Sequence, residues 1–168
     1  MKTLTKDQII MLHEQLIDHF GGSPGIRDES LLDSALSAPF QTFDGLDLYT
    51  TRFSKAARLC YGLVRNHPFI DGNKRIGAHA MIMFLSLKGI MLRYKDDELI
   101  ELIMSVASGA SAESDIKGWV ALHTDTSFLQ YNQEVLDAMA EAERISRDPN
   151  TKRYSSFEEA LEDLELDD

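Results

Sequence analysis

Apolar residues recur every three or four positions along most of the first 122 residues, and capping residues or breakers interrupt this pattern. Thr5 and Gln8 have the spacing of a capping box and predict a helix that ends at the glycine pair 21–22. Asp28 is a suitable N-cap for a second helix, which we expect to end before Pro39. The first helix presents an apolar face made of Ile9, Leu12, Leu16 and Phe20.

Four more helices are predicted in the same way, over about residues 52–66, 74–88, 96–108 and 114–122. The helix over 74–88 is apolar nearly all round, which predicts that it lies at the centre of the molecule. Residues 39–51 have no helical period, so we expect an ordered loop or small flap. Residues 90–95 are expected to be extended or a tight connection. Without a long alternating strand, the fold class is all-α.

The segment after residue 128 is much more acidic than the rest of the chain. Residues 129–168 carry a net charge of −8, residues 1–128 carry −3, and the whole chain carries −11. The pattern of residues 131–147 predicts an amphipathic helix, which ends at the breaker Asp148-Pro149-Asn150. Two overlapping capping boxes that begin at Ser155 predict a second helix after it. Neither helix can bury its apolar residues alone, so we expect both to dock on a helical body. The expected anchors are Leu136, Met139, Ile145, Phe157, Leu161 and Leu164.

Composition limits the class of protein further. The length of 168 residues suits one domain with an appendage, which we divide into residues 1–126 and 127–168. Cys60 is the only cysteine, so an intrachain disulfide and a zinc finger are excluded, and a cytoplasmic location is expected. The start of the chain lacks a signal-peptide core, and no stretch is apolar enough to span a membrane. The acidic charge argues against direct DNA binding.

Residues 67–75 concentrate polar groups between two apolar helices. Gly72 and Asn73 allow a tight turn into a helix, and the amides of Gly72, Asn73 and Lys74 then form an anion site. Lys74 and Arg75 are unfavourable at a helix start unless an anion such as phosphate lies there.

Two further groups of this segment suit phosphate chemistry. Asp71 beside a phosphate is a natural Mg²⁺ ligand, and His67 has a pKa suited to removing a proton from a hydroxyl near neutral pH. These groups together predict nucleotide-dependent group transfer. We interpret His13, His19, His79 and His123 as structural or surface residues rather than ligands; contact of His79 with the site is the lesser alternative, since it lies in the apolar helix after the segment.

The segment 67–75, HPFIDGNKR, resembles the Fic motif H-P-F-x-[D/E]-G-N-[G/K]-R. Two flanking segments, FGGSPGIRDESLLDSAL and QTFDGLDLY, resemble the death-on-curing (Doc) branch of the Fic/Doc family, and the resemblance covers about residues 3–125. It implies a compact bundle of about six helices and a flap that aligns the target backbone. It also implies His67 as the base, Asp71 as the Mg²⁺ ligand, the Gly72–Lys74 amides as the anion hole, and Arg75 on the nucleotide phosphates.

Two positions separate the chain from the adenylylating pattern of this family. Lys74 stands where that pattern has glycine, and Ala78 stands where it has a second arginine. Both resemble the Doc branch, which holds ATP reversed and transfers its γ-phosphate to a threonine of elongation factor Tu. We therefore expect a type II toxin that arrests translation, with His67, Lys74 and Arg75 as catalytic residues and ATP and Mg²⁺ as cofactors. Gly72 replaces the alanine of some members, so adenylyl transfer stays open.

The tail resembles a different family. Residues 136–165 are similar to the toxin-wrapping part of a RelB/DinJ-type antitoxin, without its DNA-binding half. This resemblance implies a fusion in which residues of about 131–166 neutralise a toxin body. The short linker over 124–131 favours exchange of the tail between chains, which would give a swapped homodimer. A catalytically silent toxin–antitoxin fusion is a further alternative.

Overall fold

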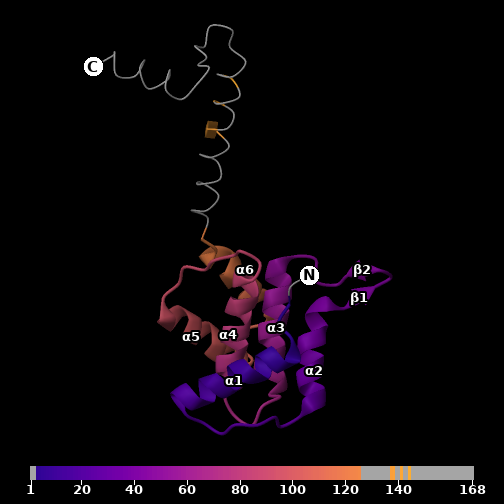
Figure 1. Ribbon diagram of the computed structural model, residues 1–168, viewed down its shortest axis with the longest axis vertical. Coiled ribbons are helices and arrows are strands. Elements are labelled where there is room, and N and C mark those ends of the chain that lie inside the picture. The colour runs from indigo at the N-terminus through magenta and orange to yellow at the C-terminus, as the bar shows by residue number, and fades with distance from the viewer. Residues whose placement is uncertain (1–2, 126–136, 139–140, 142–143, 145–168) are drawn as a thin grey trace, which may run out of the picture. The chain divides into compact units, whose positions relative to one another are not determined.

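Six α-helices, a short 3₁₀ helix and a small hairpin make up the described part of the chain (Figure 1). The computed structural model describes residues 3–125 and, further on, 137–138, 141 and 144. The helices are α1 (Lys6–Phe20), α2 (Glu29–Ser37), η1 (Ala38–Phe40), α3 (Arg52–Asn66), α4 (Asn73–Ser86), α5 (Asp96–Ser108) and α6 (Glu113–His123). The predicted all-α class and helix number are therefore confirmed.

The chain forms two units, Met1–Asp125 and Thr126–Asp168. The predicted tail helices belong to the second unit, and their six expected anchors lie outside the described residues. In the part of the chain that the structure describes, no helix has the length and apolar character needed to cross a membrane.

The predicted start signals of the first two helices are confirmed. The Gln8 amide donates to Thr5 Oγ1 at 3.3 Å, and the Thr5 amide donates to Gln8 Oε1 at 2.9 Å, which completes the capping box. Asp28 Oδ1 accepts from the Leu31 amide at 3.1 Å and so caps α2. Because proline disfavours helical backbone in the residue before it, α2 stops at Ser37 and the chain turns through η1.

Helix α3, rather than α4, takes the central position, since it contacts α2, η1, α4, α5 and α6. Two glycines allow the neighbouring helices to approach α3 closely. A Cβ added at Gly77 would lie 2.5 Å from Val64 Cγ2, and one added at Gly62 would lie 3.1 Å from Ala35 Cβ. Helix α4 packs against α3 on one side, also contacts α1 and α5, and lines a cavity with part of its remaining surface. Seven of the fourteen residues of α4 are buried, so its expected burial is confirmed in part, but the central position belongs to α3.

Cys60 lies in the α3–α4 interface and is fully buried. Burial raises the pKa of its thiol to about 12, so the thiolate that would be needed for chemistry does not form near neutral pH. The residue therefore acts as a small core side chain.

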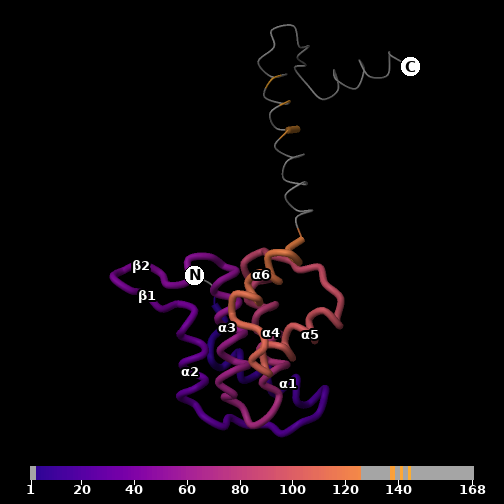
Figure 2. The backbone as a smooth tube through the Cα atoms, turned by 180° about the vertical axis from the view of Figure 1, so that it is seen from behind, coloured from indigo at the N-terminus to yellow at the C-terminus, as the bar shows by residue number. Residues whose placement is uncertain are grey.

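A short hairpin lies within the predicted flap of residues 39–51. Strand β1 (Thr42–Phe43) pairs antiparallel with β2 (Leu46–Asp47) across Asp44 and Gly45, which both have positive φ. An Asp-Gly pair is well suited to such a tight turn. Figures 1 and 2 show the hairpin projecting from the helices. The Lys55 ammonium lies 2.6 Å from Asp47 Oδ2 and ties the flap to α3.

The end of the first unit is paired with the connection between α4 and α5. The Arg93 amide donates to the His123 carbonyl at 2.8 Å, and the Asp125 amide donates to the Met91 carbonyl at 2.8 Å. Arg93 Nε also lies 2.7 Å from Asp125 Oδ2. The segment that could act as a linker therefore starts after Asp125 and not at Thr124.

Candidate functional site

The loop that carries residues 67–72 runs antiparallel to the connection between α1 and α2. The Ile70 amide donates to the Gly25 carbonyl at 3.0 Å, and Ile26 forms a bridge with Phe69. The Pro68 carbonyl accepts two amides, from Arg27 at 2.7 Å and from Asp28 at 3.1 Å. Residues 21–28, the brace, thus run along the loop and support it.

Two buried polar side chains fix the shape of the loop from inside. Asn73 is 6% exposed, and its amide group both accepts from the Phe69 amide and donates to the Phe69 carbonyl, each at 2.9 Å. His13 is 1% exposed, stacks on Phe69 with ring centroids 3.9 Å apart, and makes a 2.8 Å hydrogen bond from Nε2 to the Asp71 carbonyl. The Asn73 side chain is therefore committed to the loop, which leaves its backbone amide for any ligand.

Replacing Asn73 with alanine is expected to lower the free energy of unfolding by about 1–3 kcal/mol, because the Phe69 amide and carbonyl lose their buried partner. Urea denaturation measures this change. Asn66→Ala is the control, since the Asn66 amide donates only a longer 3.4 Å bond to the Leu31 carbonyl and its loss should cost at most about 1 kcal/mol. Equal losses in both variants would contradict a special role for Asn73.

His67 occupies the C-cap position of α3 in a left-handed conformation, with φ 49° and ψ 55°. Its side chain is exposed. Residues other than glycine adopt this conformation rarely, at a cost of about 1–3 kcal/mol. The strained backbone turns the chain sharply out of α3 and leaves the imidazole open to a ligand.

The Asp71 carboxylate lies at the turn into α4. Its Oδ1 accepts the Gly72 amide at 2.6 Å, and its Oδ2 lies 4.0 Å from Arg75 Nη2. These contacts hold the pKa of Asp71 below its ordinary value, chiefly through the hydrogen bond from the Gly72 amide, with smaller effects from the Ser23 amide and Arg75. The carboxylate is half exposed and stays ionised at neutral pH.

The first turn of α4 carries two cations and no acidic residue. The Ile76 amide makes the first bond of the turn, to the Gly72 carbonyl at 3.0 Å, so the amides of Asn73, Lys74 and Arg75 precede the helical hydrogen bonds. The Gly72 amide, which we predicted to belong to the anion site, donates to Asp71 instead. This helix start has the amides, dipole and charge to bind an anion.

Arg75 is held over the end of α1. Its Nη1 donates to the Gly21 carbonyl at 2.7 Å. A Cβ added at Gly22 would lie 2.6 Å from Asp71 Oδ2 and 3.3 Å from Arg75 Nη2. Only a residue without a side chain allows the brace to pass this close to both groups.

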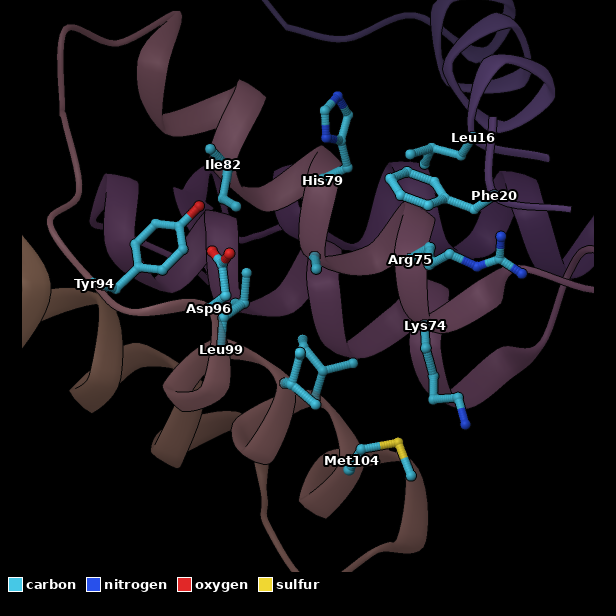
Figure 3. Close-up of a pocket in the computed structure, with 13 residues that line it drawn as sticks. Leu16, Phe20, Lys74, Arg75, His79, Ile82, Tyr94, Asp96, Leu99 and Met104 are labelled. Atoms are coloured by element: carbon cyan, nitrogen blue, oxygen red, sulfur yellow. The ribbon is translucent and has the colours of Figure 1, made fainter. Parts of the chain in front are cut away.

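A cavity of about 510 Å³ lies beside the start of α4. Its lining comes from α1 (Leu16, Phe20), α4 (Lys74, Arg75, Ala78, His79, Ile82), the segment before α5 (Tyr94) and α5 (Asp96, Leu99, Ile100, Ile103, Met104). Figure 3 shows Lys74 and Arg75 at one end, with their charged groups pointing away from the apolar middle, and Tyr94 and Asp96 at the other. The cavity thus offers an apolar surface next to a cationic rim.

The structure places the predicted residues in two groups. Lys74 and Arg75 line the cavity, whereas His67, Asp71, Gly72 and Asn73 belong to the turn before it. His79 also lines the cavity, and His13 is structural as expected but bonded to the site loop. No local pattern predicts the contact of the Arg27 side chain with the His67 carbonyl or that of His13 with the Asp71 carbonyl, because these partners are 40 and 58 residues apart in the chain.

Asp71 provides only part of the coordination shell of a magnesium ion. Among the described residues, no group of three or more His, Cys, Asp or Glu side chains could hold a metal by itself. Mg²⁺ commonly takes one or two carboxylates and completes its shell with phosphate oxygens and water. The single ionised Asp71 therefore fits Mg²⁺ that arrives together with a nucleotide.

Comparison with known proteins gives two curated relatives. "Toxin Doc" from Mycolicibacterium smegmatis is 40% identical over 91 residues, which cover 53% of this chain and 70% of that protein. "Protein kinase doc" from Escherichia phage P1 is 27% identical over 116 residues, which cover 69% of this chain and 90% of that protein. Residues 3–85 match the Fic/DOC family, and this stretch contains α1 to α3, the whole site loop and α4 up to its next-to-last residue. Together with the geometry of that loop, these matches show that the chain belongs to the Fic/DOC family.

Proposed function

We propose that this protein is a toxin that transfers the γ-phosphate of ATP to a protein hydroxyl, by resemblance a threonine of elongation factor Tu. The observation that carries this proposal is the start of α4, where Lys74, Arg75 and three amides without helical partners lie beside the ionised Asp71. One relative carries the name of a toxin and the other that of a protein kinase, which supports both halves of the proposal.

Each group of the turn has a definite task in this reaction. The exposed imidazole of His67 removes the proton of the target hydroxyl as that oxygen attacks the γ-phosphorus, and the bond from this phosphorus to the bridging oxygen breaks so that ADP leaves. Lys74, Arg75 and the amides at the start of α4 hold the phosphates and stabilise the charge that develops on them. Asp71 would hold Mg²⁺, which would supply further positive charge to the phosphate oxygens when bound.

Replacing Asp71 with asparagine is expected to raise the Mg²⁺ concentration needed for activity and to leave the melting temperature unchanged. The asparagine oxygen still accepts the Gly72 amide, but the negative charge that attracts the metal is lost. A titration of activity with Mg²⁺ at fixed ATP measures the effect, and Asp18→Asn on the exposed side of α1 is the matched control. Unchanged Mg²⁺ dependence, or a variant that unfolds, would contradict the ligand role.

Phosphoryl transfer is favoured over adenylyl transfer by two side chains of α4. Lys74 adds bulk and charge where a glycine would let phosphates approach the backbone closely. Ala78 lines the cavity with a methyl group, so this position offers no cation to a terminal phosphate. Adenylyl transfer is the second candidate, because Gly72 leaves the approach to the turn open.

The projecting hairpin is proposed to align the target chain. The side chains of Phe43 and Leu46 are 76% and 74% exposed, and both strands are only two residues long. A target segment that adds to one edge would gain main-chain hydrogen bonds and apolar contacts with these residues. Lys55 and Asp47 keep the hairpin at a fixed position on α3 while it does so.

The acidic tail is proposed to be the neutralising segment of an antitoxin, over residues of about 131–166. Its net charge is −8, and its expected apolar anchors cannot be buried within the tail alone. By its resemblance to such a segment the tail would dock in a groove on a toxin body, of its own chain or of a second one, and keep a cytoplasmic toxin silent.

The test is to incubate the chain, with and without residues 129–168, with ATP, Mg²⁺ and elongation factor Tu, and to weigh the products. A phosphoryl-sized mass addition to elongation factor Tu, greater without the tail, is the expected result. An AMP-sized addition would select adenylyl transfer instead. The absence of any addition from both forms would select the silent fusion.

A further inference from the structure

We propose that Arg27, in the brace, is a positioning residue that holds His67 in its left-handed conformation. Arg27 Nε donates to the His67 carbonyl at 2.7 Å, and its Nη2 donates to the Asn66 carbonyl at 2.9 Å. The inference rests on the proposed function, because the role of His67 as the base belongs to that proposal.

The conformation of His67 needs support from outside its own residue. Among the described residues only Asp44 and His67 combine a side chain with positive φ. Asp44 lies in a hairpin turn that favours this conformation, whereas His67 takes the helix-end position that glycine usually fills. A strained backbone of this kind persists only where neighbouring groups fix it.

Arg27 supplies that support through its side chain and through its backbone amide. Its planar guanidinium presents two N–H groups to two consecutive carbonyls, which lack helical partners because α3 ends there. Its own amide donates to the Pro68 carbonyl at 2.7 Å. Residues 66, 67 and 68 are thus all attached to one arginine, and the peptide groups on either side of the His67 Cα cannot rotate freely.

Arg65 makes a similar contact at another helix end, and this provides a matched control. Arg65 Nη1 donates to the Ala107 carbonyl at 3.0 Å and approaches the Val106 carbonyl at 3.5 Å, at the end of α5. Both arginines therefore cap the last carbonyls of a helix, but only Arg27 contacts the peptide groups of His67. A purely stabilising role predicts similar behaviour for Arg27→Ala and Arg65→Ala.

The experiment compares the full chain with Arg27→Ala and Arg65→Ala by NMR and by residual phosphotransfer on the same samples. Positive φ brings the amide proton of a residue close to its own Hα, so a strong intraresidue NOE at His67 reports the left-handed conformation directly. We expect this NOE in the wild type and in Arg65→Ala, and its loss in Arg27→Ala. We also expect Arg27→Ala alone to lower kcat up to about 100-fold, with little change in KM for ATP, because the base is misplaced.

Arg27→Lys keeps the charge without the planar fork and is the second variant if Arg27→Ala fails to fold; a smaller loss of the NOE and of kcat is expected. A His67 NOE that persists in both Arg27 variants would overturn the inference, as would an equal loss in Arg65→Ala. A wild type that transfers no phosphate either with or without residues 129–168 would overturn the proposed function, and the NOE would still decide the role of Arg27.

Discussion

Replacing His67 with alanine is expected to lower the rate of phosphotransfer by about 10²–10⁴-fold, which is the usual contribution of a positioned general base. The imidazole is exposed at the end of α3, so its removal leaves no buried polar partner behind. The loss should therefore appear in kcat, while the melting temperature and the affinity for ATP stay close to those of the wild type.

The control for this prediction is His19→Ala. His19 is also exposed and lies in the last turn of α1, where its ring contacts Phe20 edge to face. Initial rates with saturating ATP and target, measured after removal of the tail, compare the two variants. Full activity of His67→Ala, or an equal loss in His19→Ala, would show that His67 is not the base.

Sequence reasoning succeeded where the signal is local. The capping residues Thr5 and Asp28 and the breaker Pro39 act within a few positions, and they set the bounds of α1 and α2. The turn before Lys74 was predicted for the same reason, because a glycine followed directly by a helix start determines which groups meet there.

The missed features depend on contacts between distant segments. Nothing in the local pattern shows that Arg27 contacts the carbonyl of His67, or that His13 stacks on Phe69. Asn73 was predicted to offer its backbone amide to the anion site, but the bonds of its side chain to the Phe69 backbone were not predicted, because only the folded loop brings these groups together. The cavity likewise needs α1, α4 and α5 to be placed together.

Removal of the tail is expected to increase activity by roughly three orders of magnitude. Tethering gives the tail a local concentration on the order of 1 mM at the body. With an assumed intrinsic Kd of about 1 μM, the docked state exceeds the free state by roughly a thousandfold. The same occupancy stabilises the body by about 4 kcal/mol, so the deletion should also lower its melting temperature.

A full-length variant distinguishes a tail held by apolar contacts from a tail held by charge. Phe157→Ser together with Leu161→Ser removes two of the expected anchors and keeps the acidic charge of the tail. If apolar contacts hold the tail, this variant should approach the activity and melting temperature of the deletion. If charge alone holds it, the variant should stay silent and the wild type should become active at high salt, because exposed charges are screened.

Whether the tail docks on its own chain or on a second one determines the oligomeric state. The body ends at Asp125, which is tied to Met91 and Arg93, and Tyr94 of the cavity follows directly in the chain. The five residues 126–130 span at most about 17 Å when extended. Docking within one chain therefore requires the start of the expected tail helix, at about residue 131, to lie within that reach of Asp125, and a more distant start requires exchange between two chains. The solution mass of the intact chain decides between a monomer and a swapped dimer, and equal activity and melting temperature with and without the tail would show that it does not dock at all.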